Sequence, residues 1–81
     1  MNDTSLDVLL TRLETAGLFA QLALTSEEKS TIDRNRVNSR KAYDSALQLL
    51  QRLCLAPLDL QKVYIQLAKL RDELQQLGEV L

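Results

Sequence analysis

Leucine and alanine recur every three or four residues along most of the chain, and this spacing predicts three helices. The first covers residues 5–24, with Thr4 or Ser5 as its N-terminal cap. Its apolar stripe changes from leucines to small residues near its end: Leu6, Leu10, Leu13, Gly17, Ala20 and Leu24. We therefore expect another helix to approach the end of this segment closely.

The second predicted helix covers residues 26–55, after a break in which Thr25 and Glu28 have the spacing of a capping box. Its halves differ, because residues 27–41 hold only Ile32 and Val37 as apolar residues. In residues 42–55 most apolar positions span an arc of about 160°, which is wide enough to contact two neighbours. This width predicts that the second helix is the centre of the fold, and that Cys54 is a buried apolar side chain.

The third predicted helix covers residues 57–77 and has the most regular pattern in the chain. It begins at Pro57, which suits a first helical position, and Gly78 follows it as a C-terminal cap. Its apolar residues alternate in steps of three and four over three heptads: Leu60, Val63, Leu67, Leu70, Leu74, Leu77 and Leu81.

The two breaks are short, so helices that follow one another along the chain should be antiparallel. The sequence thus predicts a single all-α domain over residues 1–81. Two arrangements fit: a three-helix up-down-up bundle, or a long antiparallel helical hairpin with a third helix alongside. In either arrangement an unbroken second helix would make the molecule elongated.

Composition argues against catalysis. The 81 residues contain no histidine, which is the usual general base and the commonest metal ligand, and the lone Cys54 has no histidine to activate it. Acidic residues are scattered, and no glycine-rich phosphate loop is present. We therefore expect no enzymatic activity, no cofactor and no metal site.

Charge and hydropathy also limit the surroundings of the protein. The net charge is −1, and no apolar run reaches the length of a membrane span. Residues 1–7 lack the basic start and apolar run of a secretory signal, and a single cysteine cannot form an internal disulfide. We expect a cytoplasmic protein that does not enter a membrane.

A basic stretch in residues 34–41 is the first candidate site, with four cations and no acid: Arg34, Arg36, Arg40 and Lys41. The simplest interpretation is a solvated helix face whose cations pair with Asp33, Asp44 and acids of the first helix. On that interpretation, replacing the middle two arginines by glutamine changes stability by less than about 0.5 kcal/mol. The alternatives are a surface for an anion or an acidic partner, and a nucleic-acid site. Nucleic acid is disfavoured because no aromatic residues are interleaved for stacking.

A second apolar face on the first helix is the other candidate, and it consists of Leu18, Phe19 and Leu22 on the side away from the main stripe. Either the helix ends at Gly17 and a rotated segment buries these residues, or they form a contact with another copy or another protein.

In a twofold dimer, this second apolar face could cover the end of the third helix at Leu74, Leu77 and Leu81. The polar half of the second helix would otherwise leave those three residues bare. The alternative is that the first helix alone covers the third within one chain, which leaves a monomer.

These patterns favour a non-catalytic helical module for protein–protein interaction that self-associates, most simply as a homodimer, with another protein as the second candidate partner. The alternative function is a small nucleic-acid-associated regulator that uses the basic stretch 34–41.

Overall fold

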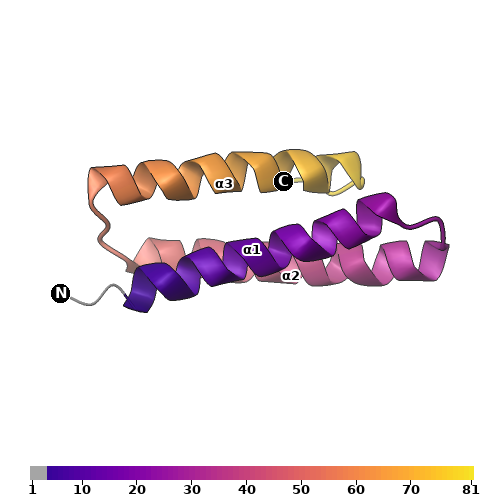
Figure 1. The fold of residues 1–81 in the computed structure, drawn as a ribbon, viewed down its shortest axis with the longest axis horizontal. Coiled ribbons are helices and arrows are strands. Elements are labelled where there is room, and N and C mark those ends of the chain that lie inside the picture. The colour runs from indigo at the N-terminus through magenta and orange to yellow at the C-terminus, as the bar shows by residue number, and fades with distance from the viewer. Residues whose placement is uncertain (1–3) are drawn as a thin grey trace.

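Three helices form the fold of residues 4–81, which are the residues that the computed structural model describes (Figure 1). They are α1, Thr4–Thr25; α2, Lys29–Arg52; and α3, Pro57–Gln76. α1 and α2 are antiparallel, and α3 runs back in the direction of α1. The all-α up-down-up prediction is confirmed, and the bundle measures 45 × 18 × 17 Å. Because α1 already begins at Thr4, its cap position lies at residue 3, outside the described residues.

α1 continues through Gly17 without a break. The alternative in which the helix ends at that glycine and rotates its last residues into the core is therefore wrong. Leu18 and Leu22 remain on the outer side of α1 and are exposed.

The centre of the bundle is α1, and the expectation that α2 would be central is wrong. α1 shares its largest interface with α2 and a smaller one with α3, whereas α2 and α3 contact each other only slightly. Small residues explain this order, because Ala16 and Ala20 are fully buried and let α2 approach closely. The buried Ser39 hydroxyl donates a hydrogen bond of 2.7 Å to the carbonyl of Ala16.

The core is formed by four residues of α1 and four of α3, together with Tyr43 and Ala46 from α2. Its members are Leu9, Leu13, Ala16, Ala20, Tyr43, Ala46, Val63, Leu67, Leu70 and Leu74. Four of them belong to the heptad pattern predicted for the third helix, which confirms that this stripe faces inward. The leucines in the second half of α2 are only partly buried, because α3 leaves that side of α2 largely open.

The α1–α2 connection differs from the predicted capping box. The Thr25 hydroxyl donates backward to the carbonyl of Gln21 at 2.8 Å and so belongs to the last turn of α1. Glu28 takes the N-cap position of α2, and its carboxylate accepts hydrogen bonds from the hydroxyls of Ser30 and Thr31. These bonds lower the pKa of Glu28. α2 consequently starts at Lys29, three residues later than expected.

Residues 53–56 link α2 to α3, and they overturn the prediction for Cys54. α2 ends at Arg52 rather than at residue 55, and both Leu53 and Ala56 have extended backbone. Successive side chains of an extended segment point to opposite sides. Leu53 and Leu55 therefore pack against the core, while Cys54 between them is exposed.

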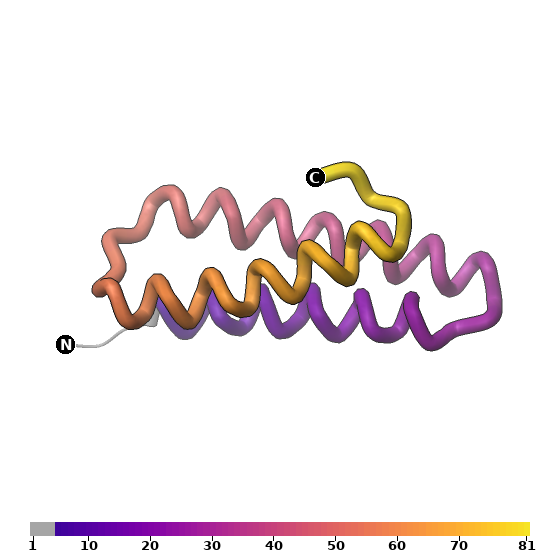
Figure 2. The backbone as a smooth tube through the Cα atoms, turned by 90° about the horizontal axis from the view of Figure 1, so that it is seen from above, coloured from indigo at the N-terminus to yellow at the C-terminus, as the bar shows by residue number. Residues whose placement is uncertain are grey.

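Gly78 ends α3 as predicted. Its φ of 92° is accessible at little cost only to a residue without a side chain. The amide of Gly78 donates to the carbonyl of Gln75, and the amide of Glu79 donates to that of Leu74, which is the bonding of a Schellman cap. After this cap the chain turns back toward α2 (Figure 2).

The two glycines predict opposite effects of alanine substitution. A Cβ at Gly17 would meet nothing within 4 Å, so Gly17→Ala should raise the free energy of unfolding by about 0.5–1 kcal/mol. Gly78→Ala should lower the free energy of unfolding by about 1 kcal/mol, because alanine strains the left-handed backbone. Urea denaturation of both variants measures the difference, and equal effects would contradict this reading of the two sites.

The linker predicts fast labelling of Cys54. Its thiol should react with a thiol reagent in the native state at a rate within a few-fold of that in urea, because the extended backbone points it outward. Protection that disappears only on unfolding would show that Cys54 is covered.

Candidate interaction surfaces

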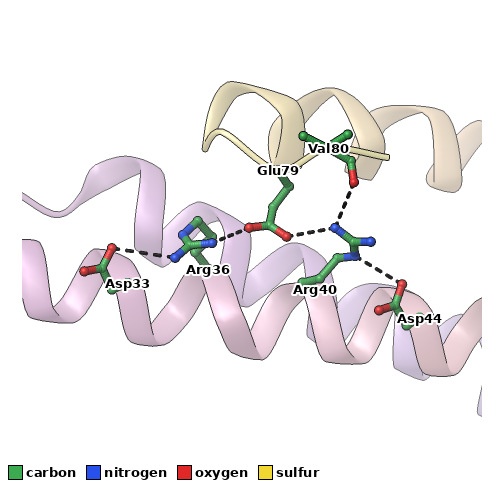
Figure 3. A network of polar contacts seen from close by, with 6 residues as sticks. All are labelled: Asp33, Arg36, Arg40, Asp44, Glu79 and Val80. Atoms are coloured by element: carbon green, nitrogen blue, oxygen red, sulfur yellow. Dashed lines mark hydrogen bonds and ion pairs between the residues drawn. The ribbon is translucent and has the colours of Figure 1, made fainter.

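Glu79 connects the C-terminal turn to the basic stretch of α2 (Figure 3). Its carboxylate pairs with Arg36 through one oxygen and with Arg40 through the other, the latter at 2.9 Å. Arg40 also donates to the carbonyl of Val80 at 3.0 Å and to Asp44 at 3.2 Å. The two arginines, which would repel each other alone, therefore share one carboxylate.

The electrostatics of this cluster favour the charged forms of Glu79 and Arg40. Partial burial, which leaves 12% of the Glu79 side chain exposed, raises the pKa of Glu79. Hydrogen bonds from Arg36 and Arg40, together with their positive charges, outweigh that effect and hold the pKa below the ordinary value of 4.5. Hydrogen bonds to Asp44 and Glu79 raise the pKa of Arg40.

The basic stretch thus divides into two pairs of cations. Arg36 and Arg40 are each about one-third exposed, and they join the end of the chain to α2. Asp33 and Asp44 contact them as expected, but the third acid is Glu79 and not a residue of α1. Arg34 and Lys41 are exposed, and no carboxylate of residues 4–81 lies within 4 Å of either.

The apolar face predicted on α1 is partly present at the surface. Leu18 is 60% exposed and Leu22 is 46% exposed, and Val8 is also exposed on this helix. Phe19 is half-buried. A hydrophobic surface of this kind on a small domain is typical of a contact site.

The proposed counterpart on α3 is less accessible. Leu74 is fully buried within the single chain, so it offers no surface to another copy. Leu77 and Leu81 are half-buried and pack against the core. The parallel neighbour α1 covers the end of α3, and the polar half of α2 meets Glu79 instead of a bare leucine stripe.

A groove of about 420 Å³ lies between α1 and α3, and we call it the α1/α3 groove. Leu18 stands at this groove, and the missing side chain of Gly17 leaves it open on the α1 side. Its lining combines apolar, amide and charged side chains: Leu13, Glu14, Gly17, Leu18, Gln21, Gln66, Lys69, Leu70 and Glu73.

Glu73 gives the α1/α3 groove its main polar feature. The residue is only 7% exposed, and one of its carboxylate oxygens accepts a hydrogen bond from the side-chain amide of Gln21. No enclosed polar side-chain atom of the described residues lacks a partner, so the other oxygen, which makes no hydrogen bond within the described residues, retains some contact with solvent. With Glu14 and Lys69, the groove carries two carboxylates and one cation.

Two further hollows lie on the other side of α3. A shallow one follows its outer surface over Pro57, Tyr64 and Ile65, and Ile65 is 65% exposed there. The second, of about 230 Å³, separates α3 from the partly buried leucines 47 and 50 of α2. α3 thus has apolar surface on both sides of its core stripe.

Sequence reasoning did not single out three acidic residues of these surfaces: Glu14, Glu73 and Glu79. Glu79 had a usable signal, because a cap at Gly78 turns the next residue back toward the antiparallel basic segment. The two carboxylates of the groove had none, because they come together only through the parallel contact between α1 and α3.

Within residues 4–81, no helix is long and apolar enough to cross a membrane. The same residues contain no group of three or more histidine, cysteine or carboxylate side chains that could hold a metal ion. Comparisons with protein-family models, curated proteins and solved structures return no match. The surfaces described above are therefore the basis for a functional proposal.

The pairing of Glu79 predicts a specific effect on stability and on its pH dependence. Glu79→Gln should lower the free energy of unfolding by about 1 kcal/mol at pH 7, a value reduced by the exposure of the arginines. A pKa lowered by folding stabilises the protein above about pH 4.5, and that stabilisation is lost as pH falls through the lower, folded-state value. Urea titrations from pH 7 to pH 3 should therefore show the two proteins converging in acid.

Glu27→Gln, at an exposed position in the α1–α2 connection, is the matched control and should follow the wild type. A constant difference between wild type and Glu79→Gln at every pH would contradict the ion pairs. A difference in the free energy of unfolding below about 0.5 kcal/mol at pH 7 would also contradict them, because that is the limit expected for a solvated helix face.

Proposed function

We propose that this protein is a non-catalytic helical module for protein–protein interaction, and that its first partner is another copy of itself. The observation that carries the proposal is the exposure of Leu18, which lines the open α1/α3 groove, and of Leu22 one turn further along α1. Burying a fully exposed leucine contributes about 1.5–3 kcal/mol, so covering the exposed half of each of these side chains contributes about 1 kcal/mol. A bundle of 81 residues has a thin core, so this gain matters to the stability of the fold.

The polar features of the surface support binding more than chemistry. The perturbed pKa of Glu79 follows from ion pairs that tie down the C-terminal turn. Such a cluster has an evident structural role, and structural ion pairs shift pKa values as active sites do. The lone, exposed thiol of Cys54 suits a reducing compartment and hence the cytoplasmic location expected from the sequence.

The nucleic-acid alternative receives less support. Two of its four cations already pair with Asp33, Asp44 and Glu79, which reduces the positive field of the basic stretch. The two remaining cations, Arg34 and Lys41, are too few for the strong phosphate contacts that such binding needs.

Self-association predicts a molar mass above that of one chain. Light scattering after gel filtration should give a mass above 9.2 kDa at tens of micromolar. The double variant Leu18→Lys with Leu22→Lys should return the mass to one chain while helicity by circular dichroism is kept, because both side chains are exposed in the single chain.

Ile65→Lys, at an exposed position on the far side of α3, is the matched control and should associate like the wild type. Dissociation by Ile65→Lys alone would move the contact to the outer face of α3. A wild-type protein that stays at 9.2 kDa up to hundreds of micromolar would overturn self-association.

A further inference from the structure

The exposed side of α2 carries a short pattern that matches the α1/α3 groove. Arg34, Val37 and Lys41 are spaced i, i+3 and i+7, so they lie on one face of the helix. All three are exposed, and the stretch between the two cations contains no acid. We call this set the α2 face. It presents one small apolar side chain between two cations that have no ion-pair partner among residues 4–81.

The α1/α3 groove has the opposite charge at a similar spacing. Glu14 lies seven residues before Gln21 on α1, and Gln21 is hydrogen-bonded to Glu73. Seven residues correspond to two helical turns, or about 10.5 Å. The same separation holds between Arg34 and Lys41 on α2. Two carboxylates near the ends of the groove therefore match two cations on the α2 face.

The middle of each surface is apolar. Between the two carboxylates, the α1/α3 groove has the exposed Leu18 and the bare backbone of Gly17, where a Cβ would meet open space, and the buried Leu13 and Leu70 form its floor. Val37 occupies the corresponding position between the cations of the α2 face and is 40% exposed. Leu18 at the groove can pack along the aliphatic parts of an incoming lysine or arginine.

We propose that the α1/α3 groove binds the α2 face of a second copy of this chain, with Arg34 and Lys41 of one copy beside Glu14 and Glu73 of the other. This inference rests on the proposed self-association and names its surfaces. Lys69 in the groove opposes the incoming cations, but the three groove charges sum to −1 and favour a cationic face.

The two surfaces belong to different helices, so each copy carries one groove and one face. Two copies that exchange these surfaces reciprocally form a twofold dimer, whereas a contact made only once in each pair builds a ring or an open row. This contact uses other surfaces than the twofold dimer expected from the sequence, in which the second apolar face of α1 covers the end of α3. Leu74, which that dimer would use, is buried in the core of the single chain. It also assigns a role to the two cations that Glu79 leaves unpaired.

A charge exchange tests the proposal on the full chain. One variant carries Arg34→Glu with Lys41→Glu, and the other carries Glu14→Lys with Glu73→Gln; glutamine at position 73 keeps an acceptor for Gln21. Each variant alone should associate at least about tenfold more weakly than wild type, because face and groove then lack opposite charges. An equimolar mixture should regain association, since each variant supplies the surface that matches the other.

Sedimentation velocity with circular dichroism measures both association and folding. The control Lys29→Glu with Lys62→Glu has the same net charge as the first variant, alters exposed cations outside both surfaces, and should retain wild-type association. Association of the wild type should weaken in 0.5 M salt because exposed charges are screened.

Self-association that survives both double variants would overturn the assignment of surfaces and leave the proposed function standing. Folded variants that dissociate alone but fail to associate when mixed would also overturn it. A wild type that never associates would overturn both proposals together.

Discussion

The close contact between α1 and α2 determines how the rest of the chain is arranged. Alanines at positions 16 and 20 remove the bulk that normally separates two helices, and Ser39 then donates directly to a backbone carbonyl of α1. Because α2 covers the alanine side of α1, the large leucines of α1 remain available to pack against α3. α3 consequently lies parallel to α1 and contacts α2 only slightly, which leaves an open groove on each side of α3.

The C-terminal turn compensates for the weak contact between α2 and α3. The Schellman cap at Gly78 places Glu79 beside Arg36 and Arg40, so an ion-pair cluster joins two segments that share little apolar surface. This cluster occupies the polar half of α2, where a leucine seam would find no partner. In the basic stretch, Arg36 and Arg40 therefore hold the C-terminal turn against α2, while Arg34 and Lys41 at its ends have no ion-pair partner among residues 4–81.

Periodicity predicted the number of helices, the inward stripe of α3 and the cap at Gly78, because these depend on neighbours within a few residues. It misjudged the central helix, since the width of an apolar arc does not reveal how closely small residues let two helices approach. Cys54 was misplaced because an extended linker alternates its side chains where a helical wheel does not. The groove carboxylates depend on a contact between segments about fifty residues apart, and no local pattern records it.

The unequal interfaces of the three helices also set an order of assembly. Contacts between α1 and α2 join segments that follow each other across a three-residue connection, so closing this hairpin costs little chain entropy. α3 must instead reach across the hairpin to a helix some fifty residues earlier, and little of it rests on α2. α1 and α2 thus form a template on which α3 docks last, and α3 is the segment whose amides exchange with solvent first when the native protein opens.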